Sequence, residues 1–143
     1  MFRAERYPQN WREIRAGILL RANNRCETCF APNSELIARH VDGGSYMLDS
    51  GEVFDAETGE FLGLARGSEY DAHRLVRVVL TVAHLDHEES NNNASNLRAL
   101  CQLHHLRHDA RDNLARRRER RDAERGQQPL PLLAAMPEHR GAR

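Results

Sequence analysis

The sequence contains no lysine: all 21 of its basic residues are arginine. Arginine suits bidentate contacts with phosphate groups, but a genome-wide codon bias that replaces lysine by arginine would give the same composition. Long apolar runs are also absent, so the sequence has neither a segment that could span a bilayer nor an N-terminal stretch typical of a signal peptide. We therefore expect a cytoplasmic protein.

Cysteine is scarce, with three residues in a chain of 143, and two of them form a Cys-x-x-Cys. An odd number of cysteines in a reducing compartment argues against a disulfide framework and favours metal binding. The length and the hydrophobic share of 40% allow one domain with a modest core.

Charge is distributed unevenly along the chain, although the formal net charge is zero. Residues 1–25 carry six arginines against two glutamates, and residues 111–125 carry seven arginines against four acidic residues. The middle of the chain, residues 33–71, holds nine acidic residues against two arginines. The basic segments are compatible with a nucleic-acid partner, which the average charge alone would argue against.

The spacing of apolar residues predicts the first elements. Apolar residues recur at helical spacing from Asn10 to Asn23, which predicts an amphipathic helix leading to Cys26. Over residues 34–72, glycines separate short segments, a pattern typical of β-hairpins. We therefore expect these residues to form an acidic β-hairpin insert. Residues 75–82 are dense in β-branched and apolar side chains, so we expect one buried strand there.

The C-terminal part of the chain is strongly polar. From about Leu100 the pattern turns helical and continues into an arginine-rich extension. Three prolines then deny a helix to the last residues, so we expect a weakly ordered tail over residues 126–143. The whole pattern predicts a single α+β domain over residues 1–125.

Two half-sites with metal-ligand spacing stand far apart in the sequence. Cys26 and Cys29 form the first, and Cys101 and His104 form the second after 71 intervening residues. Each half-site can place two ligands on one side of a metal, so together they predict a tetrahedral Cys3His zinc site. A closed set of four ligands leaves no open position, so this zinc would be structural, contributing on the order of 10 kcal/mol to folding.

Histidine is concentrated in one stretch, with six of the eight histidines between residues 73 and 108. His84 and His87 stand where the predicted strand runs into a polar loop, and His105 and His108 stand on the predicted helix. If the zinc packs the strand against the helix, the two pairs face each other. They could then hold a second metal and a base near one phosphate.

The segment from His84 to His105 resembles the HNH endonuclease family, in its phage and mobile-element branch. The resemblance is carried by a histidine at a strand end, an Asn-Leu pair in a loop, and a histidine after a cysteine half-site: His84, Asn96 with Leu97, and His105. It implies the ββα-metal (His-Me finger) fold, in which two strands and a helix clamp a divalent ion. We therefore expect such a core with a structural zinc, an N-terminal helix and the hairpin insert.

The same resemblance implies roles for individual residues. His84 would be the general base, because an imidazole with a pKa of about 6.5 is largely neutral near pH 7 and can deprotonate water. Asn96 would fix the loop or orient His84. His105 would bind a catalytic divalent ion, Mg²⁺ or another cation, which stabilises the charge that develops on the phosphodiester. His108 or Asp109, further along the helix, would be a second ligand.

Two positions depart from the family pattern. Many members have a metal-binding Asp or His just before the base, and here that residue is Ala83, whose side chain cannot coordinate a metal. Asp86 or His87 is expected to supply the missing ligand. In a second register, Asp86 and His87 would form the ligand–base pair, with a shorter spacing to Asn96. The second difference is His104, at a position where relatives often have cysteine. Zinc also accepts an imidazole nitrogen as a ligand, so this difference is compatible with a zinc site.

These features predict a metal-dependent endonuclease acting on DNA, most simply double-stranded DNA. Two alternatives stay open: a catalytically inactive zinc-stapled module that binds nucleic acid or protein, which Ala83 favours, and a structural or regulatory protein whose acidic insert docks a partner. The interleaved acids of residues 116–125 are also typical of a solvated helical face. We expect phosphate contacts from Arg98, Arg107, Arg111, Arg116 and Arg117.

Overall fold

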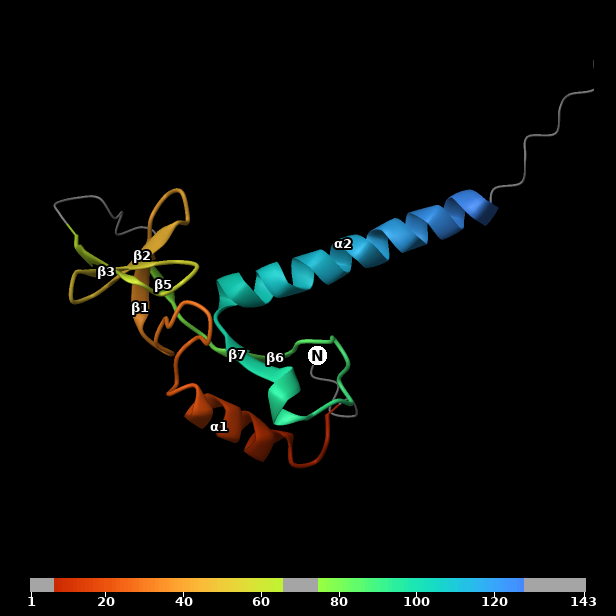
Figure 1. Cartoon of the computed structure of the whole chain (residues 1–143), viewed down its shortest axis with the longest axis horizontal. Coiled ribbons are helices and arrows are strands. Elements are labelled where there is room, and N and C mark those ends of the chain that lie inside the picture. Colours follow the sequence, from red (N-terminus) through yellow and green to blue (C-terminus); the bar gives the residue numbers. More distant parts are fainter. Residues whose placement is uncertain (1–6, 66–74, 128–143) are drawn as a thin grey trace, which may run out of the picture. The chain divides into compact units, whose positions relative to one another are not determined.

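The computed structural model describes residues 7–65 and 75–127 and combines α-helices with antiparallel β-strands (Figure 1). Contacts within the chain divide it into two units, residues 1–110 and 111–143. Apart from its first two residues, the tail expected over 126–143 lies outside the described residues. In the part of the chain that is described, no helix has the length and apolar character required to cross a membrane.

The N-terminal helix α1 spans Trp11–Arg21, as the apolar spacing predicts. Its inner face is anchored by Ile18, which is buried, and by Trp11, Ile14 and Leu19, which pack against the core. The helix lies against the strands β6 and β7 described below (Figure 1). This packing places α1 beside the histidine-rich stretch, with Trp11 stacked on His84.

The acidic insert forms most of a five-stranded antiparallel sheet with the strand order β4-β3-β2-β1-β5. Ile37, Leu48 and Val76 share one register row across three of its strands, and the buried Tyr46 lies on the same face. The β-rich prediction for this segment is therefore confirmed. The strands are β1 Leu36–Arg39, β2 Ser45–Leu48, β3 Glu52–Asp55, β4 Phe61–Leu64 and β5 Leu75–Arg77.

The expectation of one buried strand over residues 75–82 is wrong. β5 ends at Arg77, all three of its residues are exposed, and a separate strand β6 begins at Thr81. Between the two strands, the Val78 N–H donates to Glu35 O and the Leu80 N–H donates to Asn33 Oδ1. The apolar run therefore crosses from one sheet to another, and its buried residues fill the junction.

A second sheet consists of β6 Thr81–His84 and β7 Leu97–Leu100, paired antiparallel so that His84 lies opposite Leu97. A polar loop and a short 3-10 helix, Ala94–Asn96, connect the two strands. The helix α2 follows directly and spans Gln102–Gln127. Two strands and a helix thus follow one another in this part of the chain.

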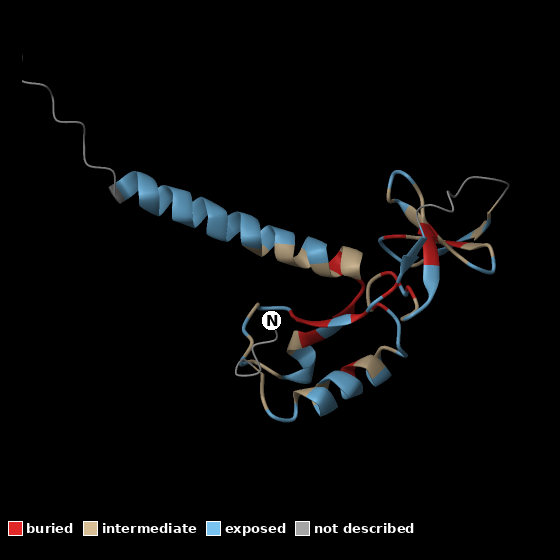
Figure 2. Cartoon of the chain, turned by 180° about the vertical axis from the view of Figure 1, so that it is seen from behind, coloured by how far each residue is buried: buried red, intermediate tan, exposed pale blue. Residues whose placement is uncertain are grey.

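Helix α2 changes character along its length (Figure 2). His104 is buried in its first turn, and Leu103 packs against the core. Beyond residue 112, every side chain described in the helix is exposed. The structural unit that holds the candidate site therefore ends with the first part of α2.

Candidate metal centre and histidine cleft

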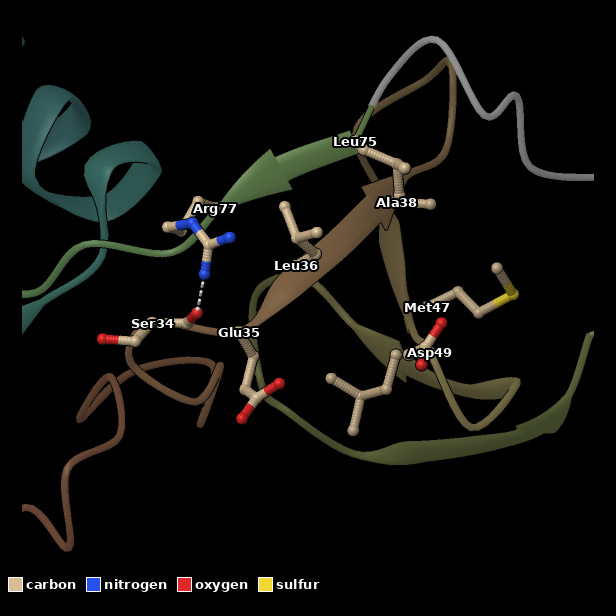
Figure 3. Close-up of a pocket in the computed structure, with 9 residues that line it drawn as sticks. Ser34, Glu35, Leu36, Ala38, Met47, Asp49, Leu75 and Arg77 are labelled. Carbon is tan, nitrogen blue, oxygen red and sulfur yellow. Dashed lines mark hydrogen bonds between the residues drawn. The ribbon is translucent and has the colours of Figure 1, made fainter.

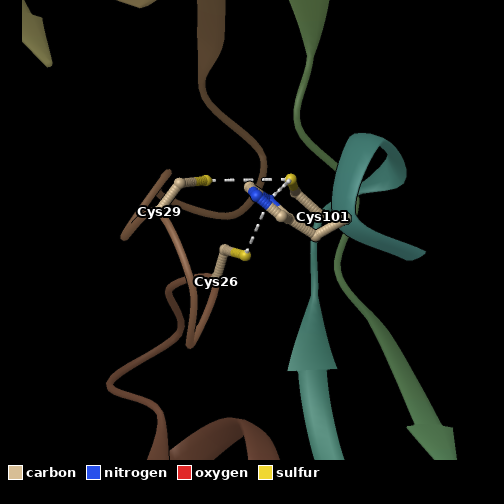
Figure 4. A group of neighbouring side chains, drawn as sticks. Cys26, Cys29 and Cys101 are labelled. Atoms are coloured by element: carbon tan, nitrogen blue, oxygen red, sulfur yellow. Dashed lines mark hydrogen bonds between the residues drawn. The ribbon is translucent and has the colours of Figure 1, made fainter. Parts of the chain in front are cut away.

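Three cysteines and one histidine from the two half-sites converge in the buried core (Figure 4). The Sγ atoms of Cys29 and Cys101 are 3.8 Å apart, and His104 Nδ1 lies 3.4 Å from Cys101 Sγ and 3.8 Å from Cys26 Sγ. A tetrahedron with Zn–S bonds of about 2.3 Å has edges of about 3.8 Å. The cluster could therefore hold a metal such as zinc, and its donor set fits that ion.

The first half-site lies on a tight knuckle that follows α1. The Phe30 N–H donates to Cys26 O, the Cys26 N–H donates to Ala31 O, and Phe30 has a φ of 59°. Glu27, between the two cysteines, holds the knuckle to β7, because its N–H donates to Ala99 O and its carboxylate accepts the Ala99 N–H. The second half-site is then set by the end of β7 and the first turn of α2.

The protonation states of the three thiols and the imidazole depend on one another. Hydrogen bonding to the Cys101 thiol raises the pKa of Cys29, whereas the same partner lowers the pKa of Cys26. The Cys101 and Cys26 sulfurs raise the pKa of His104 to about 9. If all three sulfurs bound a metal as thiolates, a divalent cation would supply the positive charge that three buried anions require.

His84 ends β6 and is buried, with 8% of its surface exposed. Its ring is stacked on Trp11 at a centroid distance of 5.5 Å, and its Nε2 lies 3.0 Å from Asn92 Oδ1. Because an amide oxygen accepts a hydrogen bond, Nε2 carries the proton in the neutral ring, and Nδ1 is the basic nitrogen. Asn92 lies in the polar loop after β6 and was not among the residues predicted for the site.

The cleft beside His84 has a volume of about 220 Å³ and brings together residues from the loop after β6 and from α2. His87, His108 and Asp109 have ligand atoms within 4.8 Å of one another. Asp109 lies between two imidazoles, with Oδ1 3.9 Å from His87 Nδ1 and Oδ2 3.7 Å from His105 Nε2. Of the two pairs that were expected to face each other, His84, His87 and His105 line this cleft, and His108 lies within 4.8 Å of His87 and Asp109.

His108 connects this group to β6. Its ring stacks on the ring of His87 at a centroid distance of 4.3 Å, and its Nε2 donates to the backbone oxygen of His84 at 3.0 Å. The hydrogen bond orients the His108 ring and leaves its Nδ1 as the unprotonated nitrogen. Ala83 lines the same cleft and offers no ligand atom.

Asp86 and Asn96 organise the loop rather than line the cleft. The Asp86 carboxylate accepts hydrogen bonds from the Glu88 N–H and from the side chains of Asn91 and Asn96, at 2.7 to 2.9 Å. These three donors, the Glu88 N–H first, lower the pKa of Asp86 to about 2. Of the two residues expected to replace Ala83 as a ligand, the structure thus brings His87, not Asp86, to the helix.

The arginines expected to contact phosphate lie in different environments. Arg98 is exposed on β7, and Arg107 is paired with Glu57 of the β3–β4 turn. Arg111, Arg116 and Arg117 belong to the second unit and are exposed, and Arg116 pairs with Asp112 at 2.9 Å. The ion pairs mean that two of the five arginines already have an acidic partner within the chain.

A further cavity, of about 270 Å³, lies on the five-stranded sheet (Figure 3). Leu36, Ala38 and Leu75 line it, and at its rim Arg77 donates to Ser34 O at 2.6 Å. The cavity contains no cysteine or histidine, so it has no part in the metal chemistry described above.

Comparisons of the chain with family models, with curated proteins and with solved structures found no match.

Proposed function

We propose that this chain is a metal-dependent nuclease of the HNH type, which hydrolyses phosphodiester bonds of DNA and is held together by a structural zinc. The observation that carries the proposal is the cleft: a buried histidine at a strand end lies beside an Asp–His group from the following helix. The closed Cys3His cluster beside this cleft would hold the strand and the helix in register. In this proposal β6, β7 and the start of α2 form the ββα-metal core.

His84 is the general base of the proposed reaction. Asn92 holds the proton on Nε2, so the lone pair of Nδ1 is available to accept the proton of an attacking water. The imidazolium that forms lies on the face of Trp11, within the distance at which an aromatic ring stabilises a cation. The chain thus supplies a base with a defined tautomer and a partner for the charge it acquires.

The residues that would hold the catalytic ion are His87, His108 and Asp109, with His105 contacting the other oxygen of Asp109. Imidazole and carboxylate ligands suit Mn²⁺ and related divalent cations, and Mg²⁺ is compatible with the carboxylate. When bound, such an ion would neutralise a non-bridging phosphate oxygen and stabilise the leaving oxyanion. Asp109 would fix the imidazoles on either side of it.

The direct test is His84→Ala, assayed by nicking of supercoiled plasmid DNA in Mg²⁺ or Mn²⁺. We expect the rate to fall at least 10²-fold, the range over which general-base catalysis acts, with zinc content and circular dichroism unchanged. His40→Ala is the matched control, because His40 lies on the insert and pairs with Asp42. Nicking by His84→Ala at the unsubstituted rate would refute the assignment.

A second candidate is a catalytically inactive module that binds nucleic acid through the same framework. Ala83 favours it, because the cleft has no ligand atom at the residue before His84. A gel shift that retains DNA, together with no nicking in any of several divalent metals, would decide for this candidate.

A further inference from the structure

One nitrogen of the Cys/His cluster has no hydrogen-bond partner. His104 directs Nδ1 toward the cysteine sulfurs, so its Nε2 points away from them, and this Nε2 is buried without a partner. A histidine that binds a metal through Nδ1 carries its proton on Nε2, and metal-bound histidines almost always donate that proton to a carboxylate, a carbonyl or water. A buried donor with no acceptor weakens the site.

Glu57 presents an oxygen to this nitrogen. Its Oε2 lies 3.9 Å from His104 Nε2, beyond hydrogen-bond distance but facing the same atom. Its other oxygen is paired with Arg107, one turn further along α2. The carboxylate is thus held between two groups of the same helix, and a movement of about 1 Å would bring it into hydrogen-bond range of the imidazole.

The turn that carries Glu57 is docked on the cysteine knuckle. A Cβ on Gly59 would lie 2.7 Å from Cys29 O, and the φ of Gly59 is +72°, so no side chain fits there. The hydroxyl of Tyr46 also donates to Cys29 O, at 2.7 Å. Asp55 Oδ1 shapes the turn by accepting the N–H groups of Glu57 and Thr58. These contacts fix the insert against the cluster.

We propose that Glu57 is a positioning residue for the metal: it accepts the Nε2 proton of His104 and so orients the one nitrogen ligand of the Cys3His set. A fourth cysteine would need no such acceptor, because a thiolate has no second polar atom. The proposal gives the acidic insert a role in metal binding. It rests on the zinc site of the proposed function and is independent of the nuclease chemistry.

The test measures zinc affinity of the full chain by competition with a chromophoric chelator. We expect Glu57→Leu to weaken zinc binding about 10- to 100-fold, the range found when the partner of a metal-bound histidine is removed. Glu57→Gln retains an acceptor oxygen and should lose less. Glu60→Leu, on the same turn, is the matched control and should bind zinc like the unsubstituted chain.

Repeating the Glu57 substitution in a chain that carries His104→Cys distinguishes an effect of the hydrogen bond from an effect of the carboxylate charge. In His104→Cys, we expect Glu57→Leu to cause no loss of zinc affinity, because the donor is gone, whereas a purely electrostatic role would lower affinity in both backgrounds. Equal losses in the two backgrounds, or no loss in the histidine background with either Glu57 variant, would overturn the proposal. Arg107→Gln leaves the carboxylate in place and should retain most of the affinity. Absence of DNA cleavage would leave these results unaffected, whereas a chain that binds no zinc at all would refute both the zinc site and this inference.

Discussion

Replacing Cys101 by alanine should unfold the unit that contains the cleft. Cys101 lies next to Cys29 and His104, and it connects the end of β7 at Leu100 to the start of α2 at Gln102. Metal binding to such a site is worth on the order of 10 kcal/mol. Holding the ends of a 71-residue loop together without it would cost about 4 kcal/mol in loop entropy. Because small domains are stable by only about 5 to 15 kcal/mol, the loss removes most or all of the stability.

The single tryptophan provides the assay. Trp11 packs against the core and stacks on His84, so its fluorescence reports on the unit that contains the Cys/His cluster. Thermal unfolding would be followed for the zinc-loaded chain, for the same chain treated with a chelator, and for Cys101→Ala. Thr28→Ala, between the two cysteines of the knuckle, keeps all four ligands and should unfold like the zinc-loaded chain.

We expect no cooperative transition, or one lowered by more than 20 °C, in the chelated chain and in Cys101→Ala, since about 1 kcal/mol corresponds to roughly 4 to 8 °C in a domain of this size. A transition within about 3 °C of the zinc-loaded value in both samples would refute the reasoning. The cluster would then be a set of buried thiols with no metal to hold.

Three further predictions concern the cleft and its loop. Asn92→Ala should lower the nicking rate at least roughly ten-fold with zinc content unchanged, because His84 loses the acceptor that fixes its tautomer. A nicking rate equal to that of the unsubstituted chain would contradict this role. His87→Ala should raise the Mn²⁺ concentration needed for half-maximal nicking at least roughly ten-fold, and an unshifted metal titration would remove His87 from the ligand set. The Asp86 carboxyl should titrate near pH 2 by carbon NMR. Since this folded pKa is below the ordinary value of about 3.9, the carboxylate should stabilise the loop above about pH 4 and lose that effect as the pH falls through about 2. In Asn96→Ala the pKa of Asp86 should rise, and an unmoved pKa would show that the amide does not stabilise the carboxylate.

The clustering of the three cysteines with His104 and the general α+β character could be predicted from the sequence because they depend on patterns that are local or repeated. Equal spacing in the pairs Cys26/Cys29 and Cys101/His104 indicates a common ion, and the structure brings all four residues together. Helical spacing of apolar residues likewise predicted α1. In both examples the spacing of residues along the sequence is enough to predict the structure that they form.

The contacts that were not predicted depend on tertiary placement. Residues 75–82 look like one strand because apolar content does not distinguish a strand interior from a crossing between sheets. Asn92 contacts His84 from a loop in which the side chain of Asn91, the preceding residue, is hydrogen-bonded to Asp86. Glu57 is one of many acids in the insert, and its position beside His104 follows from the docking of a turn on the knuckle. A carboxylate near a histidine ligand has no fixed sequence spacing that could reveal it.

The separation of the two half-sites along the chain has a consequence for how the protein is made. A ribosome that adds about 5 to 20 residues per second needs roughly 4 to 15 seconds to proceed from Cys29 to His104. During that interval the emerging Cys26 and Cys29 thiols have no partners to complete the tetrahedron, while the strands of the insert can already pair. A metal could therefore gain all four ligands only after His104 is synthesised, by which time the strands of the insert can have paired.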